Sequence, residues 1–240
     1  MIKFDCHVHS IASGHAFGTV EEIAGYCRRY GMDGFVLTDH GPAIPGSAND
    51  LYFNAIRMLP RRLDGIQVLR GVEANLMDYD GHVDLPDDLL RRLDVVIASF
   101  HEILIEPTKR EDHTRALIAA AHNPLIDILG HTGRGNYRYD IPAVLAACKA
   151  TGTMVEINRW TIKKRKSDRD VCLDIALACR DLGVPIVINS DAHTADAVGQ
   201  VDLAEELVRS IDFPEDLIMN RNAEVFKTDL IRRKPWLKLD

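Results

Sequence analysis

The sequence lacks the features of membrane and secreted proteins. Its longest apolar runs fall well short of the roughly 18 residues that a membrane-spanning helix needs, and its first residues form an expected strand rather than a signal-peptide pattern. The five cysteines are scattered without a C-x-x-C spacing, which is typical of reduced thiols and not of a disulfide framework. These absences favour a cytoplasmic protein that does not bind membranes.

An excess of basic charge is also missing. Lys and Arg together number 29 against 36 Asp and Glu, so the formal net charge is −7. This balance opposes nonspecific binding to phosphate backbones, and no track of aromatic and basic residues is visible, so we expect no stable nucleic-acid binding. Linkers, repeats and low-complexity stretches are absent too. With 46% hydrophobic residues, the chain can fill one core, and we expect a single domain over residues 1–240.

Short apolar runs alternate along the chain with segments of helical periodicity. Such runs are typical of buried parallel strands. The expected strands cover residues 2–8, 34–38, 66–74, 94–100, 126–131, 153–158 and 184–190. The expected helices cover residues 19–31, 109–122, 140–151, 167–182 and 202–211. This βα repeat predicts an α/β fold, in the form of a closed or nearly closed barrel of seven strands.

Residues of the types that bind metal ions stand at or just after the end of nearly every expected strand. They are His7, His9, His15, His40, Glu73, His101, His131, Asp191 and His193. His7 and His9 are two residues apart on a strand, so both face one side, and Cys6 is expected to face the other. In α/β barrels the carboxyl ends of the strands meet at the active site. The repetition therefore indicates a multi-metal hydrolytic site, while the remaining histidines, His82, His113 and His122, are expected to be surface or packing residues.

Five short motifs resemble those of the PHP (polymerase and histidinol phosphatase) family, and within it a group of probable phosphatases. They are Asp5–Ser10, Thr38–His40, Gly71–Glu73, Ser99–His101 and Ser190–His193. The likeness extends nearly from end to end of the chain. It implies a distorted (β/α)7 barrel of the TIM-like kind that carries three divalent metal ions. In this family the ions are usually zinc, and manganese or iron occurs in relatives.

The resemblance also implies three sets of ligands, carried over residue by residue. The first ion would be held by His7, His9, Glu73 and Asp191. The second would be held by Glu73, His101 and His131, with the Glu73 carboxylate bridging. The third would be held by His15, His40 and His193. Glu73, Asp191 and His193 are in addition the residues we expect to be catalytic.

Charge explains why such a site suits phosphate. Three divalent ions and two carboxylates leave about four positive charges, which a phosphoryl dianion would partly neutralise. Paired ions also lower the pKa of bound water and orient the resulting hydroxide for attack. We therefore expect a phosphatase that hydrolyses a phosphomonoester of a small metabolite by metal-bound hydroxide. Two alternatives stay open: a phosphodiesterase or nuclease, and a metal-binding regulatory module with little activity. An amidohydrolase is less favoured because Glu73 stands where many of those enzymes use a modified lysine. As for the oligomeric state, the sequence is compatible with a homo-oligomer.

Substrate contacts are expected from two arginines on the catalytic rim. Arg134 follows the fifth ligand-bearing strand end and Arg159 follows the next strand, and a guanidinium fork matches phosphate geometry. Arg159-Trp160 departs from the small polar residues that the family more often has at this point. Two interpretations of Asp39 stay open: an acceptor of hydrogen bonds that orient ligands, and a structural cap. The loop of residues 41–49 is a candidate lid.

Overall fold

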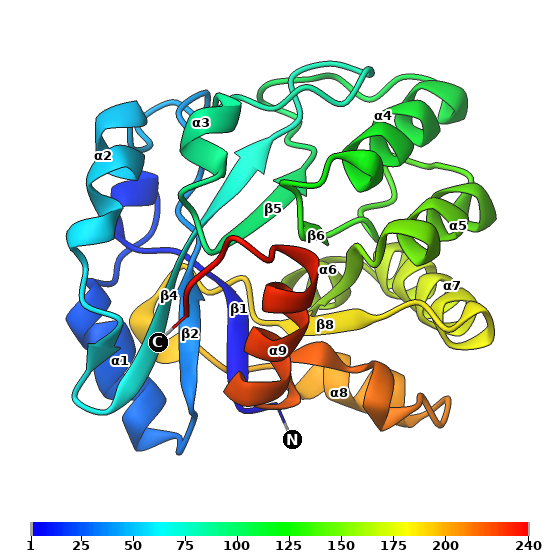
Figure 1. Cartoon of the computed structure of the whole chain (residues 1–240). Helices are drawn as coiled ribbons and strands as arrows, with labels where there is room; N and C mark the ends of the chain where they lie inside the picture. Colours follow the sequence, from blue (N-terminus) through cyan, green and yellow to red (C-terminus); the bar gives the residue numbers. More distant parts are fainter. Residues whose placement is uncertain (1, 240) are drawn as a thin grey trace.

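Parallel strands form the centre of the fold, as Figure 1 shows. Seven of them pair in one sheet. The computed structural model describes residues 2–239. The strands are β1 (Phe4–Val8), β2 (Gly34–Leu37), β4 (Ile66–Asn75), β5 (Val95–Ser99), β6 (Ile128–Leu129), β7 (Met154–Asn158) and β8 (Ile186–Asn189), paired in that order. A short strand, β3 (Arg62–Leu63), runs antiparallel to the start of β4. The predicted fold class, a TIM-like barrel of seven parallel strands, is confirmed.

The sheet closes almost completely between β8 and β1. Near the carboxyl ends, the His9 amide donates to the carbonyl of Ala192 at 2.9 Å. Nearer the amino ends of β1 and β8, the Asn220 side chain takes the place of direct backbone hydrogen bonds between the two strands. Its Nδ2 donates to the carbonyls of Phe4 (2.8 Å) and Ile188 (2.7 Å), and its Oδ1 accepts the Ile188 amide at 3.0 Å. A buried side-chain amide therefore satisfies backbone groups that a strand would otherwise pair.

Helices surround this sheet in Figure 1. They are α1 (Val20–Arg29), α2 (Asp50–Ala55), α3 (Asp87–Leu90), α4 (Arg110–His122), α5 (Ile141–Thr151), α6 (Arg159–Lys164), α7 (Lys166–Leu182), α8 (Asp202–Arg209) and α9 (Ala223–Arg233). Short 3-10 turns lie at Ile11–Ser13, Ile56–Met58, Ala195–Ala197, Glu215–Leu217 and Met219–Arg221. Local signals set several ends: Thr19 and Glu22 form a capping box on α1, and Gly152 ends α5 in the left-handed region. Within residues 2–239 no helix has both the length and the apolar character to cross a membrane.

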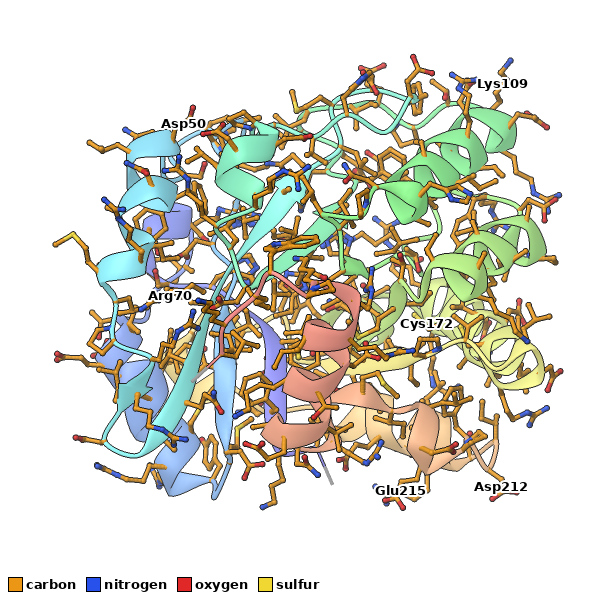
Figure 2. All side chains as sticks on the ribbon, viewed as in Figure 1. Asp50, Arg70, Lys109, Cys172, Asp212 and Glu215 are labelled. Carbon is orange, nitrogen blue, oxygen red and sulfur yellow. The ribbon has the colours of Figure 1, made fainter. Side chains whose placement is uncertain are left out.

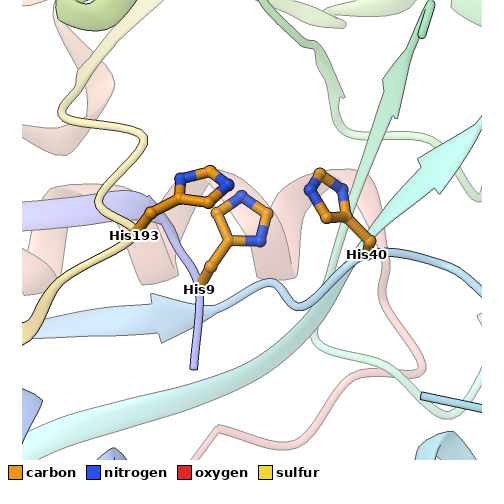
Figure 3. Close-up of side chains that lie close together, drawn as sticks. All are labelled: His9, His40 and His193. Carbon is orange, nitrogen blue, oxygen red and sulfur yellow. The ribbon is translucent and has the colours of Figure 1, made fainter. Parts of the chain in front are cut away.

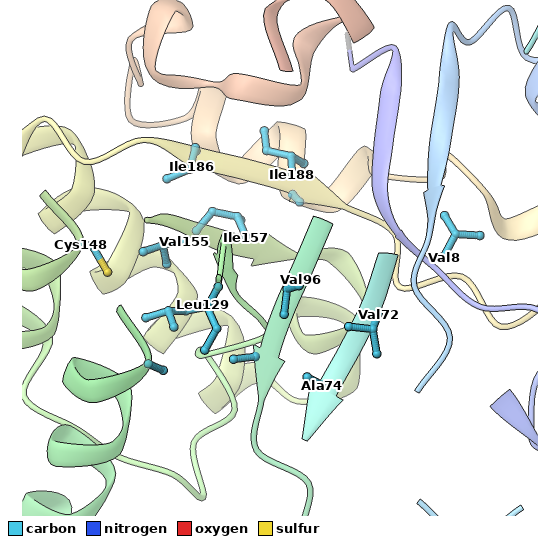
Figure 4. Close-up of a cluster of buried hydrophobic side chains, with 14 of the residues drawn as sticks. Val8, Val72, Ala74, Val96, Leu129, Cys148, Val155, Ile157, Ile186 and Ile188 are labelled. Carbon is cyan, nitrogen blue, oxygen red and sulfur yellow. The ribbon is translucent and has the colours of Figure 1, made fainter. Parts of the chain in front are cut away.

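Apolar side chains form two layers on the two faces of the strands. The outer layer lies between strands and helices, where Figure 4 shows Val72, Val96 and Ile188 among its members. The inner layer fills the barrel with residues such as Leu69 and is closed from below by Phe226 of α9. Charged residues such as those labelled in Figure 2, Asp50, Lys109, Asp212 and Glu215, stay at the exposed periphery. Above the inner layer, the inward strand positions become polar.

The first strand departs from regular alternation. Its register with β2 shifts between Asp5 and Val8. Cys6 belongs to the inner apolar layer, and His7 also points inward, because its Nδ1 lies 2.7 Å from Glu156 Oε1. The expectation that Cys6 faces away from His7 is therefore wrong, since an irregular register turns two consecutive residues to the same side. Burial raises the pKa of the Cys6 thiol well above its usual range, and we assign it to packing.

The loop of residues 41–49, the candidate lid, is tied to the barrel. The Gly41 amide donates to the carbonyl of Glu73 at 2.9 Å, and Asp84 accepts the Ala43 amide at 2.9 Å. Ser47 Oγ donates back to the carbonyl of Gly41 at 2.8 Å. These bonds describe a compact turn beside the site rather than a segment without contacts.

Candidate metal centre

The expected metal ligands converge above the carboxyl ends of the strands. A cavity of about 430 Å³ opens there, and five of them line it: His15, His40, His101, Asp191 and His193. His131 and Asp191 adopt left-handed backbone angles, with φ of 30° and 57°. Such angles are unfavourable for residues with a side chain and concentrate at functional sites. The backbone is thus strained at the two positions where His131 and Asp191 enter the ligand cluster.

Glu73 occupies the centre of the cluster and is fully buried. Its Oε1 lies 2.8 Å from His131 Nε2 and 3.4 Å from His101 Nε2. Its Oε2 lies 2.7 Å from His40 Nδ1 and 3.3 Å from His7 Nε2. Each oxygen of one carboxylate therefore faces a different group of imidazoles, which is the arrangement of a bridging ligand.

A second set of contacts meets at His15, on the exposed side of the cluster. Its Nε2 lies 3.3 Å from His40 Nε2 and 3.2 Å from His193 Nε2. One Nε2 carries either a hydrogen or a lone pair, so it cannot form two good hydrogen bonds of this kind. Tetrahedral nitrogen ligands about 2.0 to 2.1 Å from a zinc ion would be about 3.3 Å apart. The observed spacing matches that of ligands around an ion.

His9 links these contacts to Asp191. Its Nε2 lies 3.3 Å from Asp191 Oδ1, and its ring centroid lies 4.3 Å from those of both His40 and His193, as Figure 3 illustrates. Three groups have ligand atoms within 4.8 Å of one another: His9 with His40 and His193, His7 with His9 and Asp191, and His40 with Glu73 and His101. They overlap the three expected sets without coinciding with them.

Several buried ligand atoms lack a hydrogen bond within residues 2–239. They are His7 Nε2, His9 Nε2, His40 Nδ1, Glu73 Oε2, and both ring nitrogens of His101. Leaving buried polar atoms unpaired costs free energy, and native proteins almost always avoid it. Imidazoles with two carboxylates also form a donor set that suits zinc-like transition metals better than magnesium. The residues present therefore fit divalent metal ions.

Glu156, which the sequence analysis did not select, fixes the orientation of His7. Its Oε1 lies 2.7 Å from His7 Nδ1 and accepts Asn189 Nδ2 at 2.8 Å. Its Oε2 accepts the His131 amide at 2.6 Å. An ionised carboxylate only accepts, so His7 Nδ1 carries a hydrogen and Nε2 is the nitrogen that faces the cluster, where it offers a lone pair when the ring is neutral. An acidic residue within the apolar strand of residues 154–158 was the signal that could have revealed it.

Ser13 fixes His9 in a similar way. Asp39 accepts hydrogen bonds from Ser13 Oγ at 2.7 Å and from Tyr52 Oη at 2.6 Å. Because Ser13 gives its hydrogen to Asp39, it accepts from His9 Nδ1 at 2.9 Å and from the His40 amide at 3.1 Å. Asp39 therefore contacts a proposed ligand only through Ser13, which the sequence did not single out. It also accepts the Ser10 amide at 2.7 Å, so both interpretations of Asp39 have contacts that agree with them.

The charges of the cluster divide between ionised carboxylates and mainly neutral imidazoles. Burial raises the pKa of Glu73, but His7 and the other histidines outweigh it and hold that pKa well below its usual range; the same balance holds for Asp191. Burial lowers the pKa of His9 well below its ordinary value and that of His131 to about 4. For His7, burial is outweighed by neighbouring carboxylates, above all Glu156, which raise its pKa well above the ordinary value.

Both expected substrate arginines line the same cavity. Arg134 places a guanidinium nitrogen 3.8 Å from Asp191 Oδ2 and is partly exposed. Arg159 donates from Nε to Asp202 Oδ1 at 3.1 Å, which anchors it to α8. Of the two guanidinium groups, that of Arg134 lies closer to the metal ligands, and the substrate-binding roles stay predictions.

The chain belongs to the PHP domain family, whose pattern matches residues 5–160. A probable phosphatase of Caldicellulosiruptor saccharolyticus is 43% identical over 94% of each chain. One of Acetivibrio thermocellus is 41% identical over 98% of this chain and 97% of its own. The family and the enzyme class expected from the sequence, a hydrolase of the phosphatase type, are confirmed by these relatives.

A solved structure with a similar fold is the histidinol phosphate phosphatase of Lactococcus lactis, complexed with zinc, L-histidinol and phosphate. It aligns with a TM-score of 0.64 over 88% of this chain and 94% of its own, at 19% identity. At this identity the likeness supports the barrel fold alone.

Proposed function

We propose that the protein is a metal-dependent phosphomonoesterase that acts on a small phosphorylated metabolite. The observation that carries this proposal is the cluster of nine ligand-type side chains, several with buried atoms that lack a hydrogen bond, beneath an open cavity that five of them line. The relatives named probable phosphatases support it. The related fold that was solved with zinc and phosphate agrees with the same chemistry.

Three ions, most naturally zinc, would be shared among the ligands around Glu73. His7, His9 and Asp191 lie on its Oε2 side, and His101 and His131 lie on its Oε1 side. His15, His40 and His193 would hold the third ion, since their Nε2 atoms meet at the cavity wall. The bridging position of one carboxylate supports two ions close together, as in paired-metal hydrolases.

Such ions would supply Lewis acidity that activates water and neutralises the charge of the phosphoryl group. The protein's own contribution is orientation. Glu156 and Ser13 hold His7 and His9 with their Nε2 atoms inward, so the two rings need little reorientation on binding. Arg134, on the cavity wall, would pair its guanidinium with a phosphate oxygen. Glu73, Asp191 and His193 remain the proposed catalytic residues.

The test is a substrate panel on protein reconstituted with zinc, manganese or iron. The panel contains phosphomonoesters, phosphodiesters, lactones and amides at equal concentration. Preferential release of phosphate from monoesters is the expected result. Faster cleavage of diesters would replace the proposal with a phosphodiesterase, and no turnover at full metal loading would favour a regulatory module. Elemental analysis of the same samples should give close to three ions per chain, and a fully loaded stoichiometry of one would overturn the trinuclear centre.

A further inference from the structure

The cavity above the metal ligands has an aromatic wall. Trp160 lines it together with His15, His40, His101 and Arg134, and its side chain is exposed. The volume of about 430 Å³ lies in the range of small-molecule sites and exceeds what a phosphoryl group alone would fill. The remaining space borders Trp160, whose indole favours a flat apolar group over a hydrated one.

We propose that Trp160 is a platform for a planar ring in the leaving group, so that the enzyme prefers phosphomonoesters of aromatic or heteroaromatic compounds. This inference rests on the proposed phosphatase function and assigns its substrate class. The phosphate would lie at the metal ligands, and the ring would stack on the indole.

The position of Trp160 is fixed relative to the metal ligands by Asn158. The Oδ1 of Asn158 caps α6 by accepting the Thr161 amide at 2.8 Å. The Nδ2 of the same side chain donates to Asp191 Oδ2 at 3.3 Å. On the other side, Arg159 ties α6 to α8 through Asp202. The helix that carries the indole is therefore held to a proposed metal ligand, as a preorganised binding wall requires.

The indole is also open to a partner. Lys163 places its ammonium 5.5 Å from the ring centroid, and no other aromatic ring within residues 2–239 stacks on Trp160. Trp236 offers a matched control. Its side chain is 44% exposed, against 49% for Trp160, and Arg91 lies over its ring as Lys163 lies over that of Trp160. It follows α9, which closes the opposite end of the barrel.

The test compares kcat/KM for phenyl phosphate and glycerol 2-phosphate in the zinc-loaded wild type and in the variants Trp160→Ala, Trp160→Phe and Trp236→Ala. Loss of an aromatic pair worth about 1 kcal/mol corresponds to a fall of about fivefold. We expect that fall for phenyl phosphate in Trp160→Ala, recovery in Trp160→Phe, and less than about a twofold change for glycerol 2-phosphate. An equal fall for both substrates, or no fall for phenyl phosphate, would overturn the platform.

A binding measurement separates this inference from the proposed function. In Trp236→Phe, the indole of Trp160 is the sole tryptophan, since the chain has two. Phenylphosphonate, which is not hydrolysed, should change the fluorescence of Trp160 in a saturable way. Methylphosphonate at equal occupancy should leave that fluorescence unchanged. If no ester is turned over but this change occurs, the phosphatase proposal fails and the aromatic site stands. If turnover is normal but the two phosphonates act alike, the aromatic site fails.

Discussion

The two ends of the barrel both bury charged side chains, yet they satisfy them differently. At the amino end, Lys234 is 1% exposed, and its Nζ lies 2.5 Å from Asp127 Oδ2. The same oxygen accepts the Val96 amide at 2.8 Å. Arg233 donates to the carbonyl of Asp127 at 2.8 Å. Beneath the inner core, the ring centroid of Phe226 lies 5.5 Å from that of Phe4. These groups find partners within the chain, apart from Asp127 Oδ1, which has no hydrogen bond within residues 2–239 and lies 3.9 Å from Arg233 Nη1.

At the carboxyl end, the buried imidazoles and Glu73 face one another, and several of their atoms have no hydrogen bond within residues 2–239. A polar cluster of this kind is unfavourable unless a ligand completes it. The difference indicates that one end stabilises the fold and the other is reserved for binding, the usual division in α/β barrels. Substitutions at each end should therefore separate stability from activity.

The largest loss of activity should come from Glu73→Gln. An amide cannot provide two anionic oxygens, so the groups on both sides of residue 73 lose their shared ligand. We expect kcat/KM for a phosphomonoester to fall at least about 100-fold, together with the metal content. His15→Ala, at the exposed edge, should cost less, because it removes one ligand of one ion. Full metal content with undiminished turnover in Glu73→Gln would refute the bridging role.

Substitutions at the amino end of the barrel should lower the free energy of unfolding instead. Lys234→Met leaves Asp127 buried without its cation, and breaking a buried pair in this way costs about 3 to 5 kcal/mol of unfolding free energy. Urea denaturation monitored by circular dichroism would measure it, with the exposed Lys238→Met as the control. Activity per folded molecule should stay unchanged. A loss of turnover in the fully folded fraction would mean that the two ends are coupled.

The barrel could be predicted from the sequence because its strands and long helices carry their own patterns. The helices α1, α4, α5, α7 and α8 lie within a few residues of the predicted segments. The helices α2, α3 and α6 escaped because they span six residues or fewer. The helix α9 was missed although Ala223, Phe226 and Leu230 stand at helical spacing, and their contact with the inner core defines it. The expected strand of residues 126–131 shortens to Ile128–Leu129, since His131 turns into the left-handed region.

The site was predictable where chemistry repeats and unpredictable where it depends on packing. Ligand-type residues at successive strand ends indicated the cluster, since the carboxyl ends of parallel strands must meet. Ser13 and Glu156 escaped because their contacts join residues from different elements: Glu156 meets His7 across 149 positions of sequence. Nothing in the local sequence around Ser13 specifies Asp39, 26 residues later, as its acceptor.

Removal of metal should destabilise the protein through the carboxyl end alone, and more strongly at higher pH. A ligand present at about 100 times its dissociation constant stabilises by about 2.7 kcal/mol, which corresponds to a fall in Tm of about 5 to 10 °C on chelation. Metal binding requires neutral imidazoles, so the stabilisation by ions grows as pH rises.

In the metal-free protein His7 contributes the opposite trend, whereas His9 and His131, whose pKa burial lowers, contribute stability that rises with pH up to about 6.5. The gap in Tm on chelation depends on His7, because an ion must displace its proton while His9 and His131 are already neutral. The folded pKa of His7 is raised above 6.5, so its contribution to stability is complete below that pH and is lost as pH rises through the folded value. The gap in Tm between loaded and chelated protein should therefore widen from about pH 6 to about pH 8. Scanning calorimetry measures it, and a gap that narrows would contradict this account of the cluster.

The smallest expected effect tests the orientation of His9. Ser13→Ala removes the acceptor for His9 Nδ1 and leaves Asp39 with one donor fewer. Loss of such an outer hydrogen bond typically weakens metal affinity by about 10- to 100-fold. Ser13→Thr keeps the hydroxyl and should restore affinity, whereas a residue needed only for packing would not be rescued in this way. Competition with a zinc-binding dye measures affinity, and chemical denaturation controls for stability. Equal affinity in Ser13→Ala and wild type would show that the buried cluster holds the His9 ring in place without this serine.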